Sequence, residues 1–206
     1  MISPSMRSAV AQSLQLPGFL GTEHNCVLTE FSLADGVDGA DALGEMMDTC
    51  EMAAAAGVNS LVLRNGQHFF GQRATIHVWL TWHDYRNANL MILLSYILLG
   101  HPDWRDAEIR IFTAYPHEQV EERRTERLAM ITSGRLPVSR RNLVVFPSDE
   151  QSNFGHLVEV TSAQADLVLF GFTIDRLHTR GADLFQRHKA LGDVLFISAQ
   201  EQVLIE

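Results

Sequence analysis

Four short runs of this sequence are apolar on both faces, and they limit the folds that the chain can adopt. These runs cover residues 61–63, 143–146, 167–170 and 194–197. Strands of this kind are typical of a sheet that helices cover on both sides. Segments with helical spacing of apolar residues alternate with them along the chain. The sequence therefore predicts an α/β fold, a doubly wound and mostly parallel sheet with helices on both faces.

The pattern of apolar residues and of helix caps places the individual elements. Helices are predicted over residues 6–16, 88–99, 118–133, 154–162 and 183–191, with another that begins at Asp41 and ends before Gly57. Strands are predicted over residues 26–31, 60–63, 75–81, 108–113, 142–146, 166–172, 194–198 and 202–205. The helix over 88–99 is apolar almost all round, so we expect it to be buried on most sides, in the core or under a partner.

Charge and composition exclude several classes of protein. The 206 residues include 16 Lys and Arg against 25 Asp and Glu, which gives a net charge of −9. A negative chain of this kind predicts no nucleic-acid binding and no direct binding to anionic lipid. The longest apolar run covers residues 90–99 and is shorter than the ~20 residues that span a bilayer. Two cysteines are too few for a disulfide scaffold or a four-ligand zinc site, which favours a reduced cytoplasmic setting.

No motif for catalysis, cofactor binding or metal binding emerges, so no catalytic, cofactor-binding or metal-ligating residue is predicted. The loop after Phe170 has one glycine, Gly171, where a phosphate-binding loop needs several unhindered N–H groups. His77 and His83 lie near Asp84 but lack the spacing of metal ligands. Three further features are interpreted as structural: Cys26 and Cys50 as buried apolar residues, Ser139-Arg140-Arg141 as a solvated strand entry, and residues 121–124 as a charged helix face.

Five stretches, taken in order, resemble the C-terminal cytosolic domain of cation–chloride cotransporters. The first three are IHVWL at 76–80, NANLMILLSYILL at 87–99 and WRDAEIRIF at 104–112. In that family the corresponding segments read I-D-x-W-W, N-G-G-L-x-L-L-x-x-Y-L-L and W-x-x-x-x-I-R-x-x. The last two are AQADLVLFG at 163–171, which resembles A-D-L-V-x-L-G, and LFISAQE at 195–201, which resembles the closing strand. The likeness covers residues 73–206 well and residues 9–20, 25–31 and 61–64 more weakly.

The resemblance implies a fold of two tandem halves, each similar to universal stress proteins. Residues 1–66 would be the end of a first α/β subdomain, or a lead-in βαβ segment, and residues 67–206 a complete second subdomain. The implied function is a non-enzymatic, regulatory and dimerising domain on the cytoplasmic face of the plasma (inner) membrane. The implied partners are the transporter's own transmembrane domain and a second copy of the chain, with no cofactor.

Two other functions stay open from the sequence. A free-standing nucleotide sensor of the universal-stress type would share the same fold, although fold alone is a weak guide to function. The glycine-rich nucleotide motif of those proteins is absent after Phe170, so the resemblance does not carry ATP binding with it. A hydrolase or transferase with an unusual site is the third possibility, and a cleft of carboxylates or histidines with perturbed pKa values would favour it.

Overall fold

The computed structural model describes residues 5–17, 22–32, 38–66, 69–81, 86–115, 140–147 and 154–201. Its strands are β1 (Cys26–Ser32), β2 (Asn59–Asn65), β3 (Thr75–Leu80), β4 (Glu108–Tyr115), β5 (Leu143–Pro147), β6 (Leu167–Gly171) and β7 (Asp193–Ser198). Its α-helices are α1 (Met6–Gln15), α2 (Asp38–Ala55), α3 (Ala88–Leu99), α5 (Phe154–Ser162) and α6 (Ile174–Arg180). Short 3-10 turns are η2 (Pro102–Trp104), η4 (Arg140–Asn142) and η5 (Gly181–Leu184).

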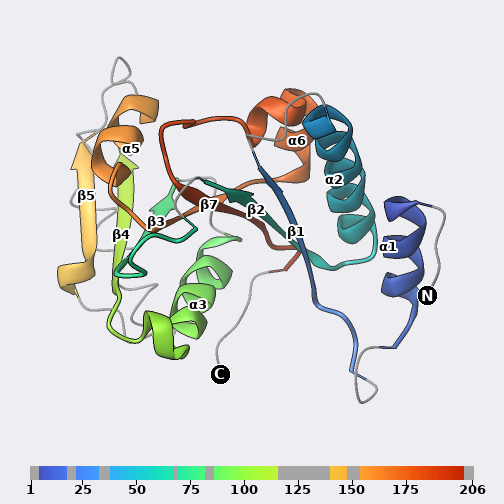
Figure 1. The fold of residues 1–206 in the computed structure, drawn as a ribbon, viewed down its shortest axis with the longest axis horizontal. Coiled ribbons are helices and arrows are strands. Elements are labelled where there is room, and N and C mark those ends of the chain that lie inside the picture. The colour runs from blue at the N-terminus through green and yellow to red at the C-terminus, as the bar shows by residue number, and fades with distance from the viewer. Residues whose placement is uncertain are drawn as a thin grey trace.

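The strands form a sheet in the order β1-β2-β7-β6-β3-β4-β5 (Figure 1). All neighbouring pairs are parallel except β2 and β7, which are antiparallel. From β3 the chain first adds β4 and β5 on one side and then β6 and β7 on the other, which is the doubly wound arrangement. The predicted fold class is therefore confirmed. The sheet runs unbroken across β2 and β7, and the division of the chain at residue 66 stays a prediction.

The two faces of the sheet carry different kinds of side chain. Aliphatic residues of the strands pack with α3 on one face, whereas α2, α5 and α6 cover the other face, which is rich in aromatic rings (Figure 1). In β3 the predicted alternation is confirmed: Val78 belongs to the aliphatic core, while Trp79 is fully buried on the aromatic side. Trp79 stacks on Phe112, with the ring centroids 4.9 Å apart. Burial on both faces explains why these strands are apolar throughout.

Local capping accounts for several element boundaries. The Ser5 hydroxyl accepts a hydrogen bond from the N–H of Ser8 and begins α1, as its position in the sequence predicts. Gly57, two residues after the end of α2, adopts a φ of +71°, the left-handed conformation that commonly ends a helix. Helix α2 begins at Asp38, three residues before the predicted cap at Asp41, whereas α3 and α5 match their predicted bounds.

Two expectations differ from the structure. The helix predicted over residues 183–191 is wrong: the helical segment between β6 and β7 consists of α6 and η5, and residues 185–192 leave the helical path. The reason is a long-range contact with Arg64, described below. Helix α3 is buried in its first half, but Ile97 in its second half is 60% exposed, so burial on most sides holds only in part. The elements predicted over 118–133 and 202–205 lie outside the described residues.

Candidate functional site

A cavity of about 1000 Å³ lies at one edge of the sheet, between the ends of β1 and β2 and the starts of β3, β6 and β7. Small residues make up much of its wall, and its charged lining residues are Arg64, Asp166, Lys189 and Asp193. Ligands of doubly wound sheets usually bind at the carboxyl ends of the parallel strands. This cavity lies at the amino ends of β3, β6 and β7, so its position alone does not indicate a nucleotide.

Asp166, directly before β6, organises one wall of the cavity. Its carboxylate accepts hydrogen bonds from the backbone N–H groups of Gln72 at 2.9 Å and Ala74 at 2.8 Å. It also accepts from the N–H and the hydroxyl of Thr75, at 2.9 and 3.0 Å. Gly71 has a φ of +52°, and a Cβ at that position would collide with this carboxylate. These charge-assisted bonds fix the segment that leads into β3 to the start of β6.

Asp193 fixes the preceding part of the same segment to the start of β7. This side chain is 1% exposed and accepts hydrogen bonds from the N–H groups of Gly66, at 2.8 Å, and Phe70. Gly66 lies directly against Gly192, and a Cβ on Gly66 would come within 2.7 Å of the Gly192 carbonyl carbon. Glycine is therefore needed at position 66, because two backbone segments touch there.

Arg64, the penultimate residue of β2, is 1% exposed and holds the chain that precedes β7. Its guanidinium donates hydrogen bonds to the carbonyl oxygens of Phe185 at 3.2 Å, Arg187, and His188 at 2.9 Å. The guanidinium also lies over the ring of Phe196, 5.9 Å from the centroid. Burial lowers the pKa of Arg64 to about 10, and the charge of Asp193 acts in the opposite direction. Arg64 thus stays charged near neutral pH.

Three charged side chains of this cavity, Arg64, Asp166 and Asp193, therefore make their hydrogen bonds within the protein. The carboxylates of Asp166 and Asp193 accept hydrogen bonds from backbone N–H groups of the β2–β3 connection. The guanidinium of Arg64 donates hydrogen bonds to carbonyl groups of the β6–β7 connection. Most hydrogen-bonding atoms of these three side chains are therefore paired within the protein, which stabilises a fixed geometry, although the buried Nε of Arg64 has no hydrogen-bond partner among the described residues. The arrangement is a rigid joint that fastens β2 and the β2–β3 connection to the sheet formed by β3, β6 and β7.

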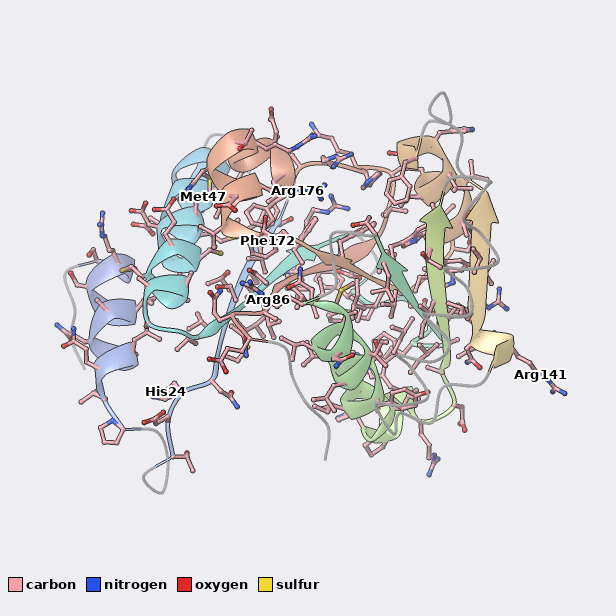
Figure 2. All side chains as sticks on the ribbon, turned by 180° about the vertical axis from the view of Figure 1, so that it is seen from behind. His24, Met47, Arg86, Arg141, Phe172 and Arg176 are labelled. Atoms are coloured by element: carbon pink, nitrogen blue, oxygen red, sulfur yellow. The ribbon has the colours of Figure 1, made fainter. Side chains whose placement is uncertain are left out.

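The opposite edge of the sheet holds the point where the strand order reverses, between β3 and β6. Asn87, 2% exposed, donates a hydrogen bond to the Phe172 carbonyl at 3.0 Å and accepts one from the Ala199 N–H at 2.8 Å. Phe172 itself is buried directly after β6 and lies below α6 (Figure 2). A bulky buried ring therefore occupies the position after β6, where a phosphate loop would need exposed N–H groups.

A buried histidine and serine form a second polar cluster, on the aromatic face of the sheet. The Ser162 hydroxyl accepts a hydrogen bond from Trp79 Nε1 at 2.9 Å and lies 2.9 Å from His77 Nδ1. Ser162 is 0% exposed and His77 is 6% exposed, so neither group faces a cleft that a substrate could enter. Burial lowers the pKa of His77 to about 4, aided by the charge of Arg110 and opposed by Glu108 and Asp166. This pair supports packing more readily than nucleophilic catalysis.

The low pKa of His77 predicts that acid destabilises the protein through this side chain. In the folded protein His77 stays neutral down to about pH 4, whereas in the unfolded chain it binds a proton near pH 6.5. Between about pH 6.5 and pH 4 the unfolded state therefore binds more protons than the folded state. Stability then falls as the pH falls. We expect His77 to contribute a loss of about 2 kcal/mol between about pH 7 and pH 5. Urea unfolding of wild type and His77→Asn at both pH values isolates this contribution, and parallel losses in the two proteins would contradict it.

The remaining residues weighed from the sequence occupy separate places. Gly171 ends β6, as a tight strand exit requires. Cys50 is buried on α2, where burial raises the pKa of its thiol to about 12 and makes it unreactive. Cys26 is half-buried in β1. Arg141 is exposed at the far end of the molecule, and His83, Asp84, Ser139 and residues 121–124 lie outside the described part of the chain (Figure 2).

Sequence reasoning missed the residues that build the cavity. In the sequence, Arg64, Asp166 and Asp193 resemble ordinary solvated residues at strand ends, and the available signal is a charged residue next to an apolar strand. Among the described residues, no three His, Cys, Asp or Glu side chains come together in a way that could hold a metal ion. None of the helices in the described part of the chain has the length and apolar character that crossing a bilayer requires.

The sheet order and the helices on both faces define a universal-stress-protein-like α/β fold, and comparison with solved structures agrees. No protein-family model matches the sequence. The structure is similar to the cytoplasmic domain of a prokaryotic cation chloride cotransporter, with a TM-score of 0.67 and 16% identity, over 96% of this chain and 72% of that one.

Two further solved structures share the fold with lower scores. One is a putative universal stress protein from Pseudomonas aeruginosa UCBPP-PA14, with a TM-score of 0.53 and 14% identity, over 97% of this chain and 70% of that one. The other is a functionally unknown protein from Pseudomonas aeruginosa PAO1, with a TM-score of 0.53 and 14% identity, over 97% of this chain and 69% of that one. At these identities the likeness establishes the fold.

Proposed function

We propose that this chain is a non-enzymatic cytosolic domain that regulates and assembles an electroneutral cation–chloride cotransporter. The observation that carries the proposal is the match over 96% of the chain to the cytoplasmic domain of a prokaryotic cation chloride cotransporter. The ordered sequence motifs at 76–80, 87–99, 104–112, 163–171 and 195–201 support it independently, since they resemble the same family.

The joint around the cavity suits a domain that transmits force between partners. Asp166 and Asp193 bind the connection that leads from β2 to β3, which fixes the end of β2 relative to the starts of β3, β6 and β7. A rigid body of this kind can hold two transporter protomers in a defined arrangement, and a shift in that arrangement biases the transport cycle. The buried Ser162 and the internally satisfied carboxylates support a role without catalysis.

The partners in this proposal are the transporter's transmembrane domain and a second copy of the chain. The net charge of −9 would repel the body from the anionic inner leaflet, so docking would depend on protein contacts. The domain would lie at the cytoplasmic face of the membrane, with residues 1–66 as the end of a first α/β half. Light scattering at high concentration should then give a dimer mass, and a strictly monomeric mass would count against dimerisation.

The complete reading frame around this chain tests the transporter assignment directly. We expect it to encode about ten or more apolar spans of about 20 residues each, as a transport domain requires. A reading frame that codes for no such spans would overturn the proposal, whatever the oligomeric state of the isolated chain.

A nucleotide sensor is the alternative, and the similarity to a putative universal stress protein favours it at the level of the fold. Titration calorimetry with ATP, ADP and inorganic tripolyphosphate separates the two functions. Because Asn87 and Phe172 fill the point where the strand order reverses, we expect ATP to bind no more tightly than tripolyphosphate. Binding of ATP about tenfold tighter than of tripolyphosphate would reveal a nucleoside site and favour the sensor.

A further inference from the structure

Three arginines lie together on α6 and on the segment that follows it. Arg176 and Arg180 are four residues apart and so share one side of the helix, and Arg187 follows the η5 turn. Arg176 is half-buried, whereas Arg180 and Arg187 are exposed. Figure 2 shows Arg176 on α6, above the buried Phe172. We call these three residues the arginine cluster.

The positive charges of the arginine cluster have no carboxylate partner among the described residues. Other arginines of the chain pair with acids: Arg7 with Asp48 at 3.2 Å, and Arg110 with Glu108 at 2.8 Å. No ion pair joins the cluster to an acid in the described part of the chain, although exposed acids, Asp175 and Asp183, lie in the same stretch of sequence.

Within the cluster, the charges of Arg176 and Arg180 act on Arg187. Partial burial of the otherwise exposed Arg187 side chain lowers its pKa, and the positive charges of Arg180 and Arg176 lower it further. The guanidinium groups of Arg176 and Arg180 therefore repel that of Arg187, within a chain whose net charge is −9. Like charges that are grouped without an ion pair to any described carboxylate cost stability, which is expected where a bound group of opposite charge offsets the cost.

The backbone that presents the cluster is held in place. The Arg64 guanidinium donates hydrogen bonds to the carbonyl oxygens of Arg187 and His188, so the main chain at Arg187 is fixed. At the other end of the segment, the Thr173 hydroxyl accepts the N–H of Arg176 at 3.3 Å and caps α6. Gly181, with a φ of +56°, ends α6 and begins η5, and after η5 the ring of Phe185 lies 5.3 Å from that of Phe172, just before α6. A fixed backbone reduces the entropy lost when these side chains bind a ligand.

We propose that the arginine cluster binds a phosphate group carried by a soluble anion. Guanidinium groups match phosphate oxygens with paired hydrogen bonds, and a group of several oxygens can accept from more than one arginine at once. A bilayer is a poorer source of the phosphate, because the rest of this acidic protein would be repelled by an anionic surface. The inference stands apart from the proposed transporter function, since it depends only on residues 173–188 and on Arg64.

Calorimetric titration of the chain with inorganic pyrophosphate tests the proposal. We expect saturable binding to the wild-type protein, weakened by about tenfold or more in the variant R176Q/R180Q/R187Q. The matched control is R7Q/R105Q/R110Q, which removes the same total charge from other surfaces and should change the affinity by less than about twofold. The single variant R180E, at an exposed position, keeps the test valid if the triple variant fails to fold.

Three outcomes would overturn the proposal. The first is the absence of saturable pyrophosphate binding to the wild-type protein. The second is an equal loss of affinity in the cluster variant and in the control, which would assign the effect to net charge. The third comes from co-sedimentation with phosphatidylcholine/phosphatidylglycerol vesicles: cluster-dependent vesicle binding without pyrophosphate binding would make lipid headgroups the source of the phosphate. Each result is independent of the reading frame, so this proposal and the proposed function can fail separately.

Discussion

Substitution of Arg64 by methionine should lower the free energy of unfolding by about 3–5 kcal/mol. Methionine fills a similar volume but cannot donate a hydrogen bond, so the carbonyl oxygens of Phe185, Arg187 and His188 lose their shared donor. The substitution also leaves the buried Asp193 without the nearby positive charge. An unpaired group in a buried setting costs more than the hydrogen bond gained when it is paired.

Arg64→Lys provides the matched comparison. Lysine retains the charge but concentrates it on one nitrogen, so it cannot reach three carbonyls as the flat guanidinium does. We expect the loss of unfolding free energy in Arg64→Lys to be more than half of the loss in Arg64→Met. Urea unfolding of the three proteins gives these values, and amide exchange at residues 185–188 should accelerate in both variants. A loss below about 1 kcal/mol for Arg64→Met would show that the β6–β7 connection holds its path without Arg64.

Asp166→Ala should lower the free energy of unfolding by about 2–4 kcal/mol, the second largest effect that we expect. The carboxylate accepts from three backbone N–H groups and one hydroxyl, and alanine removes all four bonds together. Part of the loss is offset, because the segment at Gln72 is exposed and water can reach the freed N–H groups. The remaining loss comes from Thr75, which lies at the start of a buried strand.

Two further variants make the Asp166 result specific. Asp166→Asn keeps the size and one acceptor oxygen, so its loss should fall between those of wild type and alanine. Asp106→Ala removes an exposed aspartate elsewhere and should change stability by less than about 0.5 kcal/mol. Chemical denaturation measures all three, and faster amide exchange at Ala74 and Thr75 should accompany the loss in Asp166→Ala. Equal effects of Asp166→Ala and Asp106→Ala would mean that the joint contributes no stability.

The sequence predicted most of the fold because the buried strands are short apolar or alternating runs and the helices carry apolar residues at helical spacing. The bounds of α3 and α5 follow from such local patterns, and so does the alternation in β3. The expected helix over 183–191 failed because Arg64, 121 residues before Phe185, binds carbonyl oxygens that a helix would have used for its own N–H groups. No local pattern contains that contact.

The cavity could not be predicted from the sequence because it too depends on contacts between residues far apart in the chain. Asp166 and Asp193 contact groups that lie 91 to 127 residues earlier in the chain. A charged residue at a strand end is usually solvated, and only the assembled sheet brings these two carboxylates to the β2–β3 connection. The need for glycine at positions 66 and 71 depends on distant residues in the same way, since a Cβ at either position would collide with a neighbour distant in sequence.

The antiparallel pairing of β2 with β7 has a consequence for the order in which the protein forms. Strand β7 is the last of the described strands to leave the ribosome, yet it lies between β2 and β6. More than 120 further residues must therefore be synthesised after β2 before β7 can cover the free edge of β2. The pairing of Leu61 with Ile197 shows this separation. Contacts of such long range slow folding and leave strand edges exposed meanwhile. We expect nascent chains that end before β7 to bind chaperones, and release to follow once β7 has emerged.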